Sequence, residues 1–433
     1  MSHVETLLIK NVTVVPMKDK EEIIENGYIF VESGVIKDVG QEPYPRHLNN
    51  ATKIINGNGM VAIPGLINGH THTPMSILRG YADDLQLMEW LQKIWDVEAR
   101  MTVDDMYWCS MLSMAEMIKS GTTTFSDMYY GMDQIATGVE KVGLRALLSQ
   151  GIIEGNSDGQ EILEETVLFV EKWDKAANNR IHALLSPHSP YTCSPAIIEK
   201  IVEQAHRLDC SIHTHLAETR DEIRIIGERY GETPIALMEK IGLFTRHVIA
   251  AHGVYLTDEE IDILQRRKVG LIHNPKSNMK LGSGIAPIAS LLKKGVTVGI
   301  GTDGAASNNV LDMFEEMRFA SLLQKVSLED PTALPAYATL KMGTSIGAQA
   351  VGLEEDIGTI EEGKKADITL VDLRGIHLSP VNDVISHLIY SVKAEDVAYT
   401  IVDGRILLDK GELMTIDTEE VSWHIAEIRK RLL

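Results

Sequence analysis

The sequence predicts an α/β fold, in which a (β/α)8 TIM barrel is joined to a small β-sandwich domain built from both termini. Three features of the 433-residue chain predict it. Between Leu66 and about Leu353, short apolar runs alternate with longer segments of helical periodicity, which is typical of a parallel sheet. The apolar runs number eight, the strand count of a closed barrel. The two ends of the chain instead consist of short strand-like runs and turns.

The strand-like runs at the N-terminus are "TLLIKNVTVVP", "GYIFVESGVIKDVG" and "TKIINGNGMVAI", and those at the C-terminus are "KADITLVDL" and "AYTIVDGRILLDKGEL". Each set alone has too few strands to bury one face of a sheet, so we expect the two sets to meet. The sequence therefore predicts a composite β-sandwich domain of residues 1–64 plus 356–433. Residues 65–355 are predicted to form the barrel.

The eight apolar runs lie at 65–70, 122–127, 145–150, 181–187, 211–216, 247–252, 269–274 and 296–303. Helical segments such as "VDDMYWCSMLSMAEMIKSG" and "PAIIEKIVEQAHRLD" lie between them. In a barrel of this kind the carboxyl ends of the strands meet at one mouth, where catalytic groups gather. The residues that follow each run are therefore the candidates for a functional site.

Polar side chains that suit a metal follow several of these runs. In "PGLINGHTHTPMSILRG", His70 and His72 are separated by one residue after an apolar, β-prone run, so their side chains point the same way. The later runs are followed by His188, by His215 and Glu218, by His252 and by Asp303. Packing of the hydrophobic core does not explain so many polar groups at the same end of successive strands, because burying polar groups costs free energy. The pattern predicts a metal site at the mouth of the barrel.

With the stretches "SPHSPYT", "HTHLAET", "IAAHGVYL", "HNPKSNMKLGSGIAP" and "GTDGAASNN" added, the chain resembles the amidohydrolase superfamily, and closely its methylthioadenosine/S-adenosylhomocysteine deaminases. The stretches occur in the family's order across nearly the whole chain. The metal ligands that this resemblance implies are His70, His72, His215 and Asp303. The substrate contacts that it implies are Glu98, His188, Glu218 and Asp303.

The resemblance also bears on the number of metal ions. Two-metal relatives usually add a bridging carboxylated lysine near the end of the fourth strand, where this chain reads "LLSPHSP". We therefore expect one divalent ion per subunit. Three imidazoles and one carboxylate suit Zn²⁺ best, while iron or manganese would fit the same ligands less selectively.

The implied reaction is zinc-dependent hydrolytic deamination of the adenine ring of small nucleosides to the inosine analogue plus ammonia. The metal would lower the pKa of a bound water. Asp303 would take the proton of this water, His252 would orient it, and Glu218 would act as general acid toward the ring nitrogen. Glu98 would accept hydrogen bonds from the ribose hydroxyls, because a carboxylate has two acceptor oxygens for a cis-diol.

Methylthioadenosine, adenosine and 5'-deoxyadenosine are the expected substrates, whereas S-adenosylhomocysteine is in doubt. Relatives that accept S-adenosylhomocysteine often place an arginine just after the third strand, and Gln150 stands there in this chain. An uncharged amide replaces a guanidinium poorly as a partner for the amino-acid carboxylate. We expect S-adenosylhomocysteine to be used less well than the other nucleosides.

Several other features favour ordinary structural roles. His213 lies one layer below His215 on the same strand face, which predicts a hydrogen-bonded interior role. Trp90 and Trp95 are predicted to pack in a helix or loop, with the wall of the substrate pocket as the alternative. The charged run "ETRDEIRIIGERYGE" is predicted to be a solvated helix face.

Composition and charge limit the classes of molecule that the protein is expected to bind. The net charge of -21 and the pI near 5.1 argue against nucleic acid and anionic membrane surfaces, because both would repel the chain. The N-terminus carries charges within its apolar run, and three well-separated cysteines fit a reducing compartment. We therefore expect a cytoplasmic enzyme with a small nucleoside substrate, and the resemblance implies a homo-oligomer.

Two alternatives stay open at this point. Relatives with the same ligands deaminate guanine or cytosine, or hydrolyse triazine rings. The chain could also be a non-catalytic scaffold of the same fold, although an idle site has no reason to keep buried charges close together.

Overall fold

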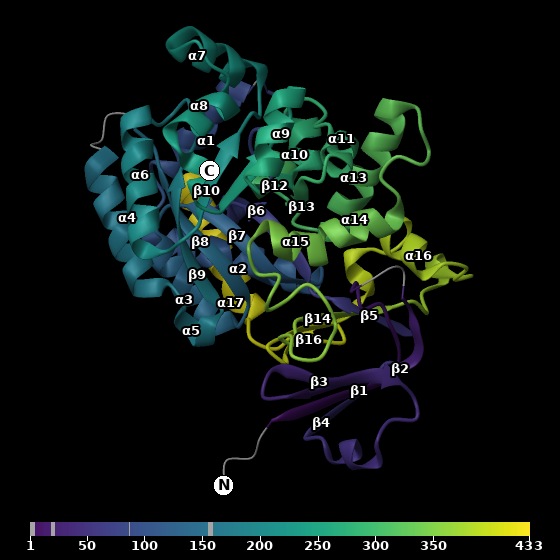
Figure 1. Ribbon diagram of the computed structural model, residues 1–433. Helices are drawn as coiled ribbons and strands as arrows, with labels where there is room; N and C mark the ends of the chain where they lie inside the picture. Colours follow the sequence, from purple (N-terminus) through teal and green to yellow (C-terminus); the bar gives the residue numbers. More distant parts are fainter. Residues whose placement is uncertain (1–4, 19–21, 86, 155–158) are drawn as a thin grey trace.

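The structure is a computed structural model that describes residues 5–18, 22–85, 87–154 and 159–433. Eight strands form one parallel sheet, and each of the eight apolar runs supplies one of them, so the predicted (β/α)8 barrel is confirmed (Figure 1). In chain order the strands are β6 (Leu66–Thr71), β7 (Thr122–Tyr129), β8 (Arg145–Ile152), β9 (Ile181–Pro187), β10 (Ile212–Leu216), β11 (Val248–His252), β12 (Gly270–His273) and β13 (Thr297–Ile300).

Side-chain hydrogen bonds help to join the first strand of the barrel to the segment after the last. The Asn68 amide accepts from the Thr302 backbone N–H at 2.9 Å and donates to the Thr302 hydroxyl at 2.8 Å. Beside this pair, the backbone N–H of Asp303 donates to the carbonyl of His70 at 2.9 Å. The seam between β6 and β13 therefore also holds Asp303 next to His70.

Helices surround the strands in Figure 1. They are α1 (Leu87–Glu98), α2 (Val103–Lys119), α3 (Met132–Val142), α4 (Gly159–Trp173), α5 (Ala176–Asn179), α6 (Pro195–Leu208), α7 (Arg220–Tyr230), α8 (Pro234–Ile241), α9 (Asp258–Arg266), α10 (Pro275–Lys280), α11 (Ile288–Lys293), α12 (Ala305–Asn308), α13 (Met313–Leu328), α14 (Ala336–Met342), α15 (Ser345–Ala350), α16 (Val384–Tyr390) and α17 (Thr418–Leu432). Polar residues fix several helix starts; Ser194 caps α6, whose first residue is Pro195. Within the described ranges, none of these helices is both long and apolar enough to cross a bilayer.

The amino end of the barrel is sealed by α15. A Cβ added at Gly270, the first residue of β12, would lie 1.9 Å from the carbonyl oxygen of Ala350, so only glycine permits this close approach. Ile67, Ile249 and Ile272 fill the barrel interior and pack with Ala350 into one buried cluster. Because this end is filled, a cavity can form only at the carboxyl end of the strands, as is usual for the fold.

The strands outside the barrel form one sheet to which both ends of the chain contribute, as predicted. In Figure 1 the purple N-terminal strands and the C-terminal strands lie together below the barrel. The N-terminal strands are β1 (Thr6–Val14), β2 (Ile24–Glu32), β3 (Val35–Gln41), β4 (Lys53–Asn56) and β5 (Met60–Pro64), and the C-terminal strands are β14 (Ile368–Asp372), β15 (Val397–Val402), β16 (Arg405–Asp409) and β17 (Glu412–Leu413). Antiparallel pairing of β5 with β14 joins the two sets. Gly65 lies between β5 and the first barrel strand; the domain bounds themselves stay a prediction.

Arg145 ties the two sheets together at the amino end of β8. Its guanidinium is 1% exposed and donates to both oxygens of Asp367, at 2.9 and 3.1 Å. It also donates to Asp403 at 2.8 Å. Both acids belong to the C-terminal part of the chain, so a buried ion cluster connects the barrel to the β domain.

Candidate metal centre and active site

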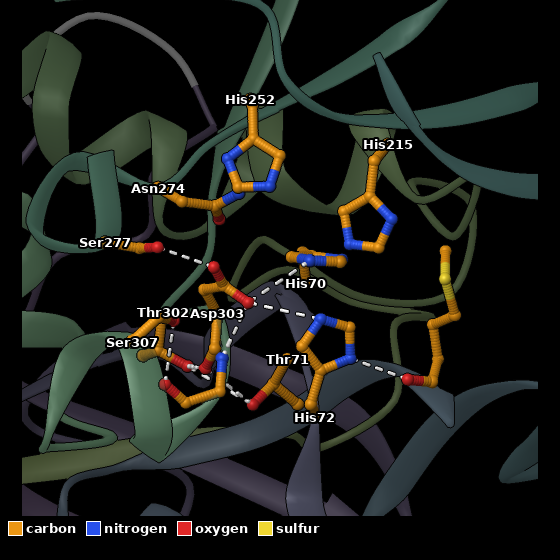
Figure 2. A network of polar contacts seen from close by, with 12 residues as sticks. His70, Thr71, His72, His215, His252, Asn274, Ser277, Thr302, Asp303 and Ser307 are labelled. Atoms are coloured by element: carbon orange, nitrogen blue, oxygen red, sulfur yellow. Dashed lines mark hydrogen bonds and ion pairs between the residues drawn. The ribbon is translucent and has the colours of Figure 1, made fainter. Parts of the chain in front are cut away.

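Four histidines and one aspartate converge at the carboxyl ends of the barrel strands (Figure 2). One ligand atom each from His70, His72 and His215 lie within 4.8 Å of one another, and the same holds for His70, His252 and Asp303. His70 belongs to β6 and His72 follows it directly, His215 and His252 belong to β10 and β11, and Asp303 lies in the segment after β13. Residues far apart in sequence thus meet at the mouth, where the strand ends predicted them.

In three of these imidazoles, the Nδ1 atom lies within hydrogen-bond distance of a neighbouring group. Nδ1 of His72 donates to the carbonyl of Met128 at 2.6 Å, and Nδ1 of His215 donates to the carbonyl of His188 at 2.8 Å. Nδ1 of His70 lies 2.9 Å from Nε2 of His213. These contacts leave the Nε2 atoms of all three rings facing one another. Outer hydrogen bonds of this kind are typical of histidines that bind a metal.

The surroundings of the buried Nε2 atom of His70 indicate whether a metal ion fits this site. Among the described residues, it has no hydrogen-bond partner. A buried polar atom without a partner is costly, and a divalent cation would satisfy this lone pair together with those of His72 and His215. The donor set of three imidazole nitrogens and one carboxylate is one that zinc accepts.

Asp303 completes the donor set. Its Oδ1 lies 3.2 Å from Nε2 of His72 and 3.6 Å from Nε2 of His70. Its Oδ2 accepts from the hydroxyl of Ser277 at 2.6 Å, which fixes the plane of the carboxylate. Burial would raise the pKa of Asp303, but its contacts with His70 and His72 hold that pKa well below the ordinary value. Asp303 is therefore a carboxylate.

His213 lies in the layer below the metal-facing rings, in the interior role predicted for it. Its Nε2 contacts His70, and its Nδ1 lies 3.3 Å from the hydroxyls of both Ser126 and Ser149. Burial lowers the pKa of His213 well below its ordinary value, so the ring is neutral. A neutral ring can accept from Nδ1–H of His70 and donate from its own Nδ1 to a serine, which orients the His70 ring.

Three non-glycine residues at this end of the barrel have left-handed backbone conformations. They are Ala217 after β10, His252 at the end of β11 and Asp303 after β13, with φ values of 53°, 80° and 60°. Such conformations cost free energy and persist only where surrounding contacts hold them. Sequence patterns did not reveal them, because alanine does not favour this conformation, and aspartate and histidine, although enriched in it, adopt other conformations far more often.

Glu218 and His252 stand together in the cavity above the metal-facing rings. Oε2 of Glu218 lies 3.9 Å from Nε2 of His252. Nδ1 of His252 lies 2.9 Å from Oδ1 of Asn278. Burial raises the pKa of Glu218, and the nearby carboxylate of Asp303 adds to this effect although His252 opposes it. Both predicted catalytic side chains therefore line the cavity that also contains Asp303.

The predicted substrate contacts Glu98 and His188 also line this cavity. The hydroxyl of Tyr129 donates a hydrogen bond to Oε1 of Glu98. Burial raises the pKa of Glu98, while this hydrogen bond and the neighbouring His72 oppose the rise. Sequence reasoning missed Tyr129, although its place at the end of β7 could have suggested it. His188 is a neutral ring, because burial lowers its pKa to about 3.

The cavity walls correct two predictions. Trp90 and Trp95, for which plain packing was favoured, both line the cavity along α1. Gln150 is not among the described lining residues, whereas Gly151 and Ile153 are. No lysine or arginine is found among the lining residues that the structure describes.

The charged run after β10 requires a further correction. Glu222, predicted to lie on a solvated face, is 1% exposed. The two oxygens of its carboxyl group accept from the backbone N–H groups of Ala217 and Glu218, each at 2.9 Å. Other charged residues of α7, such as Arg224 and Glu228, are exposed as predicted. The prediction failed at Glu222 because a side chain near the start of a helix can turn back over the preceding turn.

Comparison with known proteins agrees with this arrangement. A family model described as the amidohydrolase family matches residues 61–407. The chain is 50% identical over 428 residues to a 5-methylthioadenosine/S-adenosylhomocysteine deaminase of Desulforudis audaxviator, with 99% of each chain covered. It is 48% identical over 418 residues to a 5'-deoxyadenosine deaminase of Methanosarcina acetivorans, with 96% of this chain and 95% of that protein covered. A crystal structure of an adenosine deaminase from Xanthomonas campestris with bound zinc gives a TM-score of 0.95 at 36% identity, covering 98% of each chain.

Proposed function

This chain belongs to the amidohydrolase family, and we propose that it is a zinc-dependent deaminase of small adenine nucleosides. The reaction would replace the amino group of the adenine ring by an oxygen from water and release ammonia. One observation carries the proposal above all: Glu218 projects into a cavity whose floor holds three converging histidines and Asp303. The relatives named for methylthioadenosine, S-adenosylhomocysteine and 5'-deoxyadenosine support the nucleoside class.

His70, His72, His215 and Asp303 would hold the ion. When bound, zinc supplies a Lewis acid that makes water a usable nucleophile near neutral pH. Ser277 holds Oδ2 of Asp303, so the carboxylate keeps one orientation and can accept a proton from the attacking water. His252 would hydrogen-bond to this water through Nε2, because its Nδ1 is already engaged by Asn278.

Glu218 would donate the proton that the ring nitrogen needs. A general acid must be protonated before the reaction, and the raised pKa of the Glu218 carboxyl favours the protonated form. At the other side of the cavity, Tyr129 occupies Oε1 of Glu98. The second oxygen of Glu98 would then accept from the ribose hydroxyls, and the His188 ring would contact the substrate.

The first test is a spectrophotometric screen of the zinc-loaded protein against adenine nucleosides, with guanine, cytosine and a triazine as comparison substrates. We expect methylthioadenosine, adenosine and 5'-deoxyadenosine to be converted to their inosine analogues. S-Adenosylhomocysteine should be used less well, because no cation of the described cavity lining would meet its carboxylate. A fully metallated protein that is inert toward every adenine nucleoside would refute the proposed function.

The second test concerns the general acid. Glu218→Gln keeps the size of the side chain but cannot donate a carboxyl proton, so we expect kcat to fall by about 10²- to 10⁴-fold. Metal content should stay unchanged, because Glu218 is not one of the four proposed ligands. Near-normal turnover in this variant would remove Glu218 from the mechanism.

The chain's surroundings are also proposed rather than observed. The charge of -21 supports a small substrate over a nucleic acid. Assembly as a homo-oligomer and a cytoplasmic location stay predictions. Light scattering of the purified protein would test the first, and cell fractionation the second.

A further inference from the structure

We propose that Glu222 is a positioning residue that fixes Glu218 in the cavity through the backbone of the turn between β10 and α7. The inference rests on the proposed function, because Glu222 acts here through the proposed general acid. Glu222 itself does not line the cavity among the residues that the structure describes.

The contacts of Glu222 are unusual for a residue in a charged surface helix. Its carboxyl group is buried and accepts from two consecutive backbone N–H groups, those of Ala217 and Glu218. Two hydrogen bonds from consecutive backbone amides to one side chain fix the orientation of the peptide plane between Ala217 and Glu218. That peptide plane leads directly into Glu218. The position of the Glu218 Cα, and hence the direction of its side chain, depends on this clamp.

Two other helices of the chain provide the comparison. In α9, Glu260 accepts from the backbone N–H of its own N-cap residue, Thr257, at 2.7 Å. In α2, Asp105 does the same with Thr102 at 2.6 Å. Both are ordinary capping boxes. Glu222 occupies the equivalent helix position, but it reaches past its N-cap residue to the two residues before it.

The turn between β10 and α7 has a strained backbone that needs contacts from other segments to keep its conformation. Ala217 has a φ of 53°, a conformation that costs a residue with a Cβ about 1–2 kcal/mol. The carbonyl of Ala217 accepts from the backbone N–H groups of Val254 and Tyr255 at 2.9 and 3.0 Å, so the segment after β11 holds the other side. Without Glu222, only that side of the strained turn would remain held.

The side chain of Glu218 has little else to orient it. Within the described part of the chain, no side chain donates a hydrogen bond to its carboxyl group, and Nε2 of His252 lies 3.9 Å from Oε2 of Glu218. This freedom suits a group that must turn toward a substrate. It also means that the backbone determines where the Glu218 carboxyl group lies. A displacement of this group by about 1 Å would lower the reaction rate by up to about 10²-fold.

The variant Glu222→Gln tests this role. It keeps one acceptor oxygen and places an NH₂ group against the second backbone N–H. We expect kcat to fall by at least about tenfold, with KM and metal content within about twofold of wild type. Glu260→Gln is the matched control, because Glu260 is also buried at the same position of its helix but clamps no proposed catalytic residue. Its kcat per metal-loaded molecule should stay within about twofold of wild type.

A double-mutant cycle separates positioning from general loss of structure. In a Glu218→Gln background, Glu222→Gln should change the residual turnover by less than about twofold, because the group that Glu222 positions is already disabled. If Glu222→Gln lowers kcat as strongly in the Glu218→Gln background as in the wild-type background, the inference is overturned. It is also overturned if the kcat of Glu222→Gln is no lower than that of Glu260→Gln. If Glu222→Gln folds poorly, Glu222→Asp takes its place, since its shorter side chain cannot reach both amides and should lower kcat in the same way. Full turnover of Glu218→Gln alone would instead refute the proposed function.

Discussion

At the scale of single residues, Tyr129 determines how much of the Glu98 carboxylate is free to bind a ligand. Its hydroxyl occupies one of the two oxygens and lowers the pKa of a carboxyl group that burial raises. The remaining oxygen faces a cavity whose walls include Trp90 and Trp95. Glu98 thus combines a fixed position with one free acceptor.

The variant Tyr129→Phe should therefore weaken substrate binding more than it slows the reaction. Loss of the hydrogen bond frees Glu98 to move and to take up a proton, so we expect KM for adenosine to rise about tenfold. The value of kcat should change by less than about threefold, because the proposed proton transfers involve Asp303 and Glu218 and not Tyr129. Steady-state kinetics with adenosine and with 2',3'-dideoxyadenosine measures the effect.

The dideoxy compound lacks the hydroxyls that Glu98 would bind, so its KM should be the same in both proteins. Tyr130→Phe is the matched control, because Tyr130 also lines the cavity and interacts electrostatically with Glu98, but its hydroxyl makes no hydrogen bond to that carboxyl group. An equal rise of KM for both substrates would contradict the proposed role of Glu98.

The convergence of His70, His72, His215 and Asp303 could be predicted from sequence because these residues lie at or just after the ends of strands, and strand ends converge in a barrel. The groups that orient them could not. Met128 and His188 contribute main-chain carbonyls, which carry no residue signature. Serine is a common residue type, and the hydroxyl of Ser277 reaches Asp303 only because α10, which contains Ser277, starts next to Asp303. These partners depend on three-dimensional placement and not on any spacing along the chain.

At the scale of elements, a buried cation is one of the connections between the barrel and the β domain. Arg145 begins β8, at the end of the barrel opposite the cavity, and binds Asp367 and Asp403. Burial alone would lower the pKa of Arg145, but the two carboxylates raise it, so the cluster is ionised. The sequence placed Arg145 in a strand and favoured a structural role, but the acids lie more than 200 residues away and nothing in the pattern pairs them with it.

The variant Arg145→Met should destabilise the protein without altering the active site. It leaves two carboxylates near each other without the cation that hydrogen-bonds to both, and removing one partner of a buried ion pair costs about 3–5 kcal/mol. We expect a clearly lower Tm in calorimetry, with kcat and KM of the folded protein unchanged. The triple variant Arg145→Met, Asp367→Asn, Asp403→Asn should recover part of the loss, since no unpaired charge remains. A single variant as stable as wild type would show that the cluster contributes nothing.

Regular elements were predicted well because the pattern of apolar runs reports burial directly. The start of α7 was not, since a glutamate near a helix start can face solvent or turn inward. The residue type is the same at Glu222 and Glu228, yet one is buried and the other exposed. Only the left-handed turn at Ala217 creates the two amides that draw Glu222 inward.

At the scale of the whole molecule, the metal should contribute to folding as well as to activity. The unfolded chain does not hold its ligands together, so an ion that binds the native state stabilises it by about 2.7 kcal/mol at a free concentration 100 times Kd. We expect chelation to lower the Tm and added zinc to restore it. Glu218→Gln should show the same shift as wild type, whereas His215→Ala should show a smaller one. Equal Tm values with and without chelator would contradict the proposed site.

Buried carboxyl groups give the stability of the molecule a pH dependence of its own. Glu316 is fully buried and contacts Asn308 at 2.7 Å. Burial raises the pKa of Glu316 to about 8, and the effect of Lys276 opposes the rise without cancelling it. The unfolded chain would titrate this group near the ordinary value of 4.5. Between these two pH values the native state binds the proton more tightly than the unfolded state.

The free energy of unfolding should therefore fall as pH rises from about 5 to about 8, by up to about 1.4 kcal/mol per pH unit for this group. Its contribution is complete below the unfolded pKa and is lost as the pH passes through the folded pKa. Glu316→Gln does not titrate, so the stability of wild type relative to this variant should decrease across the same range. Urea unfolding of both proteins between about pH 6 and 8, with zinc in excess, measures the difference. A difference that stays constant or grows with pH would contradict the raised pKa, since only a group protonated in the native state gives this sign.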